Sequence, residues 1–143
     1  MAIPNSLSAL RQYQQIDIQS GASYASPHRL IQMLMEGALE SLSRAKGHLQ
    51  RGETTAKGDQ LSRAISIIGG LREGLNLDVS DLAVNLDMLY DYMQRRLIEA
   101  NVHSDETIID EITDRLHTIK EAWDAIGDTP EARSMSAASN TPA

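Results

Sequence analysis

The stretch that decides the predicted fold is Leu82–Asn101, LAVNLDMLYDYMQRRLIEAN. Its apolar residues recur every three or four positions, at Leu82, Leu86, Leu89, Met93, Leu97 and Ala100. This spacing is typical of an amphipathic helix that packs lengthwise against other helices. Tyr90 and Tyr92 flank these positions, and a tyrosine can bury its ring while its hydroxyl stays near water. The stretch is therefore predicted to have one core-facing side and a second, partly wet side on which a partner could bind.

Two segments that precede this stretch have the same spacing. Ser26-Pro27 predicts a helix start, because serine caps a first turn and proline needs no N–H partner there. Gly52 predicts the end of that helix. The apolar positions of this first segment are Ile31, Leu34, Ala38, Leu42, Ala45 and Leu49. Thr54 or Thr55 is expected to cap the second segment, whose apolar positions are Leu61, Ala64, Ile68, Leu71 and Leu75.

A further periodic segment follows the quoted stretch. Ser80 or Asp81 is expected to cap the helix of the quoted stretch, and Asp105 the helix after it. The apolar positions of that last segment are Ile108 or Ile109, Ile112, Leu116, Ile119, Trp123 and Ile126. Gly127 predicts its end.

Together these patterns predict helices over about residues 27–50, 55–76, 81–102 and 105–126. Four such helices with short links favour an antiparallel up-down-up-down four-helix bundle over residues 26–126. The predicted fold class is all-α. The core is expected to be aliphatic, since the chain has no Phe and one Trp.

The two ends of the chain are predicted to lie outside the bundle. Residues 1–25 read as an N-terminal arm with a short helix that carries Leu7, Leu10 and Tyr13 on one side. Such a helix is marginal alone and needs a surface on which to dock, so it is predicted to act as a lid. Residues 127–143 contain almost no large apolar side chain and are predicted to form a disordered, flexible tail.

The composition excludes several classes of function. With 13 Lys and Arg against 20 Asp and Glu, the net charge is −7, which disfavours nucleic-acid binding. The absence of cysteine excludes disulfides, thiolate metal sites and cysteine nucleophiles. No apolar run approaches the ~20 residues of a membrane span, and the amino terminus lacks the pattern of a secretory signal. We therefore expect a cytoplasmic protein that resides in the cytosol and does not insert into a membrane.

Catalytic patterns are weak. A di-iron bundle site needs Glu-x-x-His pairs, whereas the chain has Asp114-x-x-His117 once. No motif places a serine against a histidine and a carboxylate, so neither an enzyme nor a cofactor or metal site is expected. One alternative remains: Lys46-Gly47-His48 could belong to a histidine phosphotransfer bundle in which His48 carries the phosphoryl group.

Binding is the better supported class. Met33, Met35, Met88 and Met93 lie near the apolar positions, and methionine-rich faces adapt to partner helices. An apolar arm is available to cover a groove when no partner is bound. A generic helical adaptor module would show the same features.

Several motifs in order along the chain resemble the FliS family of flagellar export chaperones. They are Tyr13-Gln14, Ser26-Pro27 with Leu30-Ile31-x-Met33-Leu34-x-x-Gly37-Ala38, Asn85-Leu86-x-x-Leu89-Tyr90-x-Tyr92-Met93, Ala100-Asn101 and Ala122-Trp123. Each is weak alone, but the ordered set covers about residues 10–125. Met35-Glu36 departs from the Tyr-Asp that the family often has there, yet it keeps an apolar residue followed by an acid.

The resemblance implies a cytosolic chaperone that binds the disordered C-terminal segment of flagellin, prevents premature polymerisation and delivers it to the flagellar type III export apparatus. It also implies that the arm lies over part of the client site and is displaced, which adds to the lid prediction for Leu7, Leu10 and Tyr13. Helical faces place the client groove at Ile31, Leu34, Met35, Ala38, Ile65, Ile68, Leu71, Leu89, Tyr90 and Met93. A homodimer is compatible with the sequence.

Overall fold

The computed structural model describes residues 26–78, 80–127 and 129–135. In chain order these form α2 (Pro27–Gln50), α3 (Thr54–Glu73), α4 (Asp81–His103), α5 (Glu106–Ile126) and α6 (Pro130–Met135). The predicted arm, with Leu7, Leu10 and Tyr13, lies outside the described residues, as do residues 136–143.

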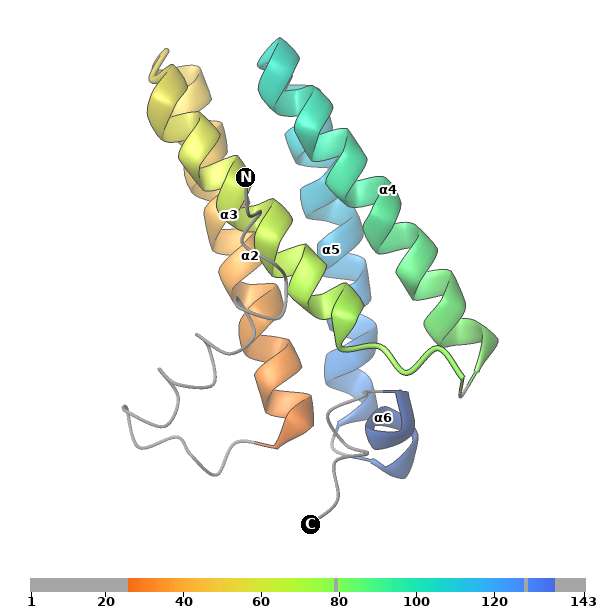
Figure 1. Cartoon of the computed structure of the whole chain (residues 1–143). Helices are drawn as coiled ribbons and strands as arrows, with labels where there is room; N and C mark the ends of the chain where they lie inside the picture. The colour runs from red at the N-terminus through yellow and green to blue at the C-terminus, as the bar shows by residue number, and fades with distance from the viewer. Residues whose placement is uncertain (1–25, 79, 128, 136–143) are drawn as a thin grey trace.

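The four long helices run alternately up and down (Figure 1). α2 packs on α3 and α5, and α4 packs on the same two helices, so the four close into one bundle. The prediction of an all-α four-helix bundle is confirmed.

Local sequence explains where the long helices begin. The hydroxyl of Ser26 accepts from the Arg29 N–H at 3.1 Å, and Ser80 accepts from the Ala83 N–H at 3.2 Å. Asp105 accepts from the first amides of α5. The predicted threonine cap of α3 is wrong, because the helix begins at Thr54 itself and the preceding residue makes no side-chain cap.

The core is aliphatic, as expected. Its fully covered side chains include Leu34, Leu42, Leu61, Ile68, Met93, Leu97, Ile109, Ile112 and Leu116. Their mutual burial supplies most of the stabilisation, at roughly 25 cal/mol for each Å² of apolar surface removed from water.

Polar contacts fix α3 against α4. The Lys57 ammonium, 2% exposed, donates to the Asn101 carbonyl at 3.0 Å and to the Ser104 hydroxyl at 2.7 Å. A cation at the C-terminal end of α4 also complements the helix dipole. Near the opposite end of the pair, Arg72 donates to Asp87 at 2.6 Å and to Asp91 at 3.0 Å. These contacts hold two adjacent helices in one register.

The predicted flexible tail is corrected for residues 130–135, which form α6. α6 packs on α2 and α5, and Met135 is only 8% exposed. The Asn76 N–H donates to the Met135 carbonyl at 3.0 Å. One buried methionine and one backbone hydrogen bond therefore dock a turn of helix that the polar sequence around it does not predict.

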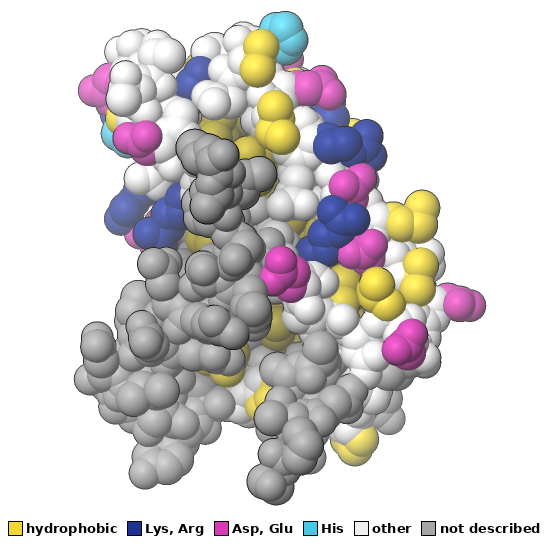
Figure 2. Space-filling model, viewed as in Figure 1, with side chains coloured by type: hydrophobic (Ala, Val, Ile, Leu, Met, Phe, Trp, Pro, Cys, Tyr) yellow, Lys and Arg dark blue, Asp and Glu magenta, His cyan; other side chains and the backbone are white. Residues whose placement is uncertain are grey.

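Among the described residues, the large hydrophobic side chains that are exposed belong to α4 or to the link that precedes it: Leu77, Leu82, Val84, Met88, Ile98 and Val102. Figure 2 shows hydrophobic side chains among charged ones along the edge of the molecule that α4 forms. α4 therefore has apolar residues on its outer side as well as in the core.

Candidate apolar client groove

A cavity of about 230 Å³ lies at the end of the bundle where α6 docks. Almost every side chain that lines it is aliphatic or aromatic: Ile31, Met35, Leu71, Leu75, Leu82, Leu86, Tyr90, Ile119, Ala122, Trp123, Ile126 and Met135, with Gly74 and Thr118. Side chains from all five of the described helices meet here. Such a site suits apolar side chains better than a charged or strongly polar ligand.

The mouth of the cavity lies between α4 and α5. Leu82 on α4 is 52% exposed, and Thr118 and Ala122 on α5 are also exposed. Leu71 and Met35, from α3 and α2, are buried and form its inner wall. The site is therefore a groove between two helices with a floor made by the other two.

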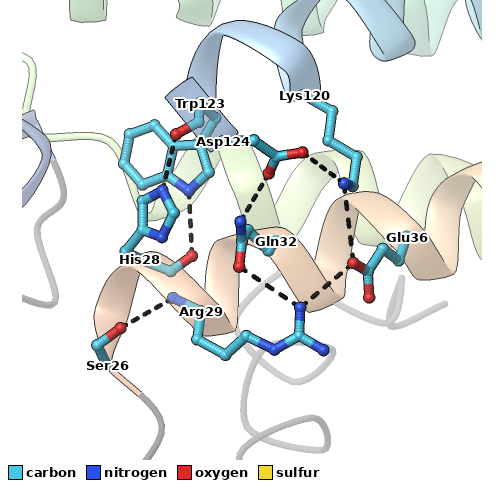
Figure 3. A network of polar contacts seen from close by, with 8 residues as sticks. All are labelled: Ser26, His28, Arg29, Gln32, Glu36, Lys120, Trp123 and Asp124. Atoms are coloured by element: carbon cyan, nitrogen blue, oxygen red, sulfur yellow. Dashed lines mark hydrogen bonds and ion pairs between the residues drawn. The ribbon is translucent and has the colours of Figure 1, made fainter. Parts of the chain in front are cut away.

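Trp123 forms one wall of this groove, and His28 holds it in place from outside the lining. Their rings stack with centroids 5.0 Å apart and planes 16° from parallel. The His28 Nε2–H donates to the Trp123 carbonyl at 2.7 Å, and the Trp123 indole N–H donates to the His28 carbonyl at 3.1 Å (Figure 3). The start of α2 is thus fixed to the end of α5.

A polar network continues from this wall along the outside of α2 and α5 (Figure 3). Asp124 accepts from Gln32 at 2.7 Å and from Lys120 at 2.7 Å. The hydrogen bond from Lys120, followed by that from Gln32, holds the pKa of Asp124 below its ordinary value. Lys120 also lies 3.8 Å from Glu36. These polar side chains lie outside the cavity lining, and they fix the start of α2 against the end of α5.

Tyr90 lies inside the site, 2% exposed, with its ring among the lining side chains. Burial strongly raises the pKa of its hydroxyl. Tyr92, two positions on, lies on another side of α4, where its hydroxyl donates to Glu111 at 2.6 Å. The two tyrosines of the quoted stretch therefore have separate environments.

The structure divides the predicted groove residues into three groups. Ile31, Met35, Leu71 and Tyr90 meet at the cavity. Leu34, Ala38, Ile68 and Met93 have no exposed surface and pack in the core, so a client could contact them only after the helices separate. Ile65 and Leu89 are partly buried against the core, away from the cavity lining.

Several lining residues are not among the predicted groove residues. They are Leu75, Leu82, Leu86, Ile119, Ala122, Trp123, Ile126 and Met135. The α5 residues among them could have been predicted from the sequence, because antiparallel packing brings the last turns of one helix beside the first turns of another. Ile119, Trp123 and Ile126 therefore lie near Ile31.

His48 is engaged by neighbours at the end of α2. Its Nδ1 lies 2.7 Å from the Glu53 carboxylate and 3.1 Å from the Arg51 guanidinium. Its contacts join the end of α2 to the start of α3. Within the described ranges, His, Asp and Glu side chains nowhere gather in threes as a metal site requires. Among the helices described, none has the length and hydrophobicity to cross a membrane.

The fold and the cavity define the class as an all-α bundle with a groove suited to apolar side chains. A family model described as "Flagellar protein FliS" matches residues 9–130. The chain is 47% identical to "Flagellar secretion chaperone FliSB" of Pseudomonas aeruginosa over 121 residues, which is 84% of this chain and 96% of that protein. It is 45% identical to "Flagellar secretion chaperone FliS" of Salmonella typhimurium, over 83% of this chain and 90% of that one. For the Vibrio cholerae protein of the same name the identity is 40%, over 91% and 95%.

The chain therefore belongs to the FliS family of flagellar proteins. The relatives are named as chaperones, and this is a non-enzymatic family. The resemblance inferred from the ordered motifs is confirmed.

Proposed function

We propose that this protein is a cytosolic flagellar export chaperone whose client is the C-terminal segment of flagellin. The observation that carries the proposal is the apolar groove between α4 and α5, found in a member of a family of secretion chaperones. The groove can take up apolar side chains that would otherwise pair with other flagellin subunits. Covering them would prevent premature polymerisation.

The client is proposed to bind by coupled folding. A segment with apolar residues at helical spacing would place them against Leu82, Leu86 and Ile119, in the way an amphipathic helix lies in a groove. Ordering such a segment costs roughly 2–5 kcal/mol of the gross interaction energy. The resulting complex can be specific and still release its client to the flagellar type III export apparatus.

Two segments are proposed to cover the groove before the client arrives. α6 supports this idea, because Met135 already contributes to the lining of the cavity. The arm of residues 1–25, with Leu7, Leu10 and Tyr13, is proposed as a second cover. Deleting residues 1–15 should then speed client association, and slower association would contradict the lid.

Isothermal titration calorimetry with a synthetic flagellin C-terminal segment tests the client. Circular dichroism of the same mixture should show more helix than the sum of the separate spectra. Saturable 1:1 binding with that gain supports both the client and coupled folding. If a folded bundle gives no heat and no gain in helix, the flagellin proposal fails, and a generic adaptor for another helical partner becomes the better interpretation.

A further inference from the structure

Three of the side chains that line the groove carry an O–H or N–H group, and two of these groups are already bonded. The Thr118 hydroxyl donates to the Asp114 carbonyl at 3.1 Å. The Trp123 indole N–H donates to the His28 carbonyl at 3.1 Å. The third group is the hydroxyl of Tyr90, to which no residue within the described ranges offers a hydrogen bond. Among the described lining side chains, Tyr90 therefore carries the one polar hydrogen that is free to bond a ligand.

The Tyr90 hydroxyl is neither bonded nor sealed off. Tyr90 is 2% exposed, and its ring lines the cavity. Burial is the single cause that raises the pKa of this hydroxyl, so no nearby charge or hydrogen bond compensates the loss of water. In the described part of the chain, the fully covered side-chain atoms without a partner are Gln60 Oε1 and Arg96 Nε, and the Tyr90 oxygen is not one of them. The hydroxyl therefore keeps contact with the space of the cavity.

An unbonded hydroxyl in an apolar site costs free energy, because it has left water without gaining a partner. A phenylalanine ring would fill the same space without that cost. Tyr92 is different, since its hydroxyl donates to Glu111 at 2.6 Å and so stabilises the contact of α4 with α5. A buried polar group that the fold does not use is suited to a ligand, because it favours ligands that can pair with it over those that cannot.

The surroundings of Tyr90 restrict the chemistry of the group that could pair with it. No Lys, Arg, His, Asp or Glu belongs to the described lining, so a charged client group would find no counter-charge there. Burying an unpaired charge costs far more than burying a neutral amide. A tyrosine hydroxyl both donates and accepts, and the amide of an Asn or Gln side chain can do the same. A neutral side-chain amide is therefore the best match.

We propose that the Tyr90 hydroxyl determines specificity in the groove by pairing with the side-chain amide of an Asn or Gln that lies among the apolar residues of the client. This inference rests on the proposed function, since it takes the flagellin segment as the client. It adds a polar requirement to a site that otherwise selects by apolar surface and shape. A segment with only apolar residues against Tyr90 would leave the hydroxyl unpaired and bind less tightly.

Tyr90→Phe tests the inference, because it removes the hydroxyl and keeps the ring. Urea unfolding of the free variant should give a midpoint at or above that of the wild type, since no bond is lost. Calorimetric titration with the synthetic flagellin C-terminal segment should give an affinity about tenfold lower, because the client amide then stays unpaired. Tyr92→Phe is the matched control. It loses the bond to Glu111, so its midpoint should fall while its affinity for the segment stays unchanged.

Substitutions in the segment identify the amide. Each Asn is replaced by Leu and each Gln by Met, one at a time, and every segment is titrated into the wild type and into Tyr90→Phe. One replacement should lower the affinity for the wild type about tenfold. The same replacement should restore most of the affinity for Tyr90→Phe, because both partners are then apolar. Such a non-additive pair indicates a direct contact between the two side chains.

Each contrary result has a separate meaning. A Tyr90→Phe protein that binds the segment like the wild type overturns the inference and leaves the proposed function intact. A Tyr90→Phe protein that is less stable than the wild type also overturns it, since the hydroxyl then contributes to the fold. If no replacement in the segment is coupled to Tyr90→Phe, the assignment to a side-chain amide is wrong. A folded wild type that does not bind the segment at all removes the proposed function, and this inference with it.

Discussion

His28 and Trp123 hold each other through two reciprocal hydrogen bonds and a ring stack, although 95 residues separate them in the chain. Each side chain donates to the carbonyl oxygen of the other residue. His28 lies in the first turn of α2 and Trp123 in the last turns of α5, so the pair joins the first and last long helices of the bundle. Trp123 also lines the cavity, so one contact both closes the bundle and shapes the groove.

Replacing His28 by Phe should separate the two contributions of this pair. Phenylalanine keeps a ring for stacking but removes the donor to the Trp123 carbonyl, so the free energy of unfolding should fall by about 1–2 kcal/mol. His28→Ala should cost more, because it also removes the stacked ring. Urea unfolding followed by circular dichroism measures both losses. Equal stability of the two variants would show that the stack contributes nothing.

Client binding in the groove should change the fluorescence of Trp123. This is the only tryptophan of the chain, and it lines the cavity, so its emission reports on this site. Titration with the flagellin segment should shift the emission saturably as the client removes water from the indole. Leu82→Glu, at the groove mouth, should lower the affinity measured in this titration at least about tenfold, because it places a charge against an apolar client.

Leu77→Glu is the control for that variant, because Leu77 is similarly exposed but does not line the cavity. It should leave the titration unchanged. If the two variants lower the affinity for the client equally, the loss comes from the change in net charge, and the groove assignment is wrong.

Sequence patterns predicted the bundle well because helix caps and apolar spacing act locally. They could not separate groove from core. Ile31 and Leu34 are both apolar residues of one helix face, yet Ile31 lines the cavity and Leu34 is fully buried. That difference depends on how closely α4 and α5 pack at one end, which no single segment encodes. Met135 shows the same limit, since one apolar side chain in a polar stretch has no periodicity to detect.

Met135→Asp should open the groove from the α6 side. The charged side chain cannot remain among the lining residues, so α6 should leave its position on α2 and α5. We expect faster association of the flagellin segment and stronger binding of an apolar dye. Stopped-flow fluorescence of Trp123 measures the first and dye emission the second. Ser134→Asp, in the same short helix but only partly buried, is the control; a Met135→Asp protein with wild-type rates would show that α6 is no cover.

Acid should weaken the α4–α5 contact through Glu111. The Tyr92 hydroxyl donates to this carboxylate at 2.6 Å, and with Arg115 and Arg96 it lowers the pKa of Glu111. Because the pKa of Glu111 is lower in the folded state, its ionised carboxylate stabilises the fold fully at any pH above the pKa that Glu111 has in the unfolded chain. This stabilisation is lost as the pH falls through the pKa that Glu111 has in the folded protein. Glu111→Gln should therefore reduce the free energy of unfolding by roughly 1 kcal/mol at neutral pH, where solvent screens the partly exposed pair.

In strong acid the same variant should unfold like the wild type, because both side chains are then neutral. Urea midpoints measured across the acidic range give the comparison. Glu121→Gln removes an exposed carboxylate from the same helix and should show no such pH dependence. A Glu111→Gln difference that stays constant with pH would mean that the loss is one of packing and not of charge.

Lys57→Met should destabilise the far end of the bundle without affecting the groove. Methionine matches the lysine stem in length, so it keeps the apolar contacts of the buried side chain but removes its ammonium. The Asn101 carbonyl and the Ser104 hydroxyl then lose their donor, and the free energy of unfolding should fall by about 1–3 kcal/mol. Because the cavity lies at the other end of α4, affinity for the flagellin segment should stay within about twofold of the wild type, a difference below 1 kcal/mol. Urea unfolding and calorimetry on one preparation give both values. A variant as stable as the wild type would show that water replaces the ammonium without loss, and that the Lys57 contacts do not stabilise the packing of α3 on α4.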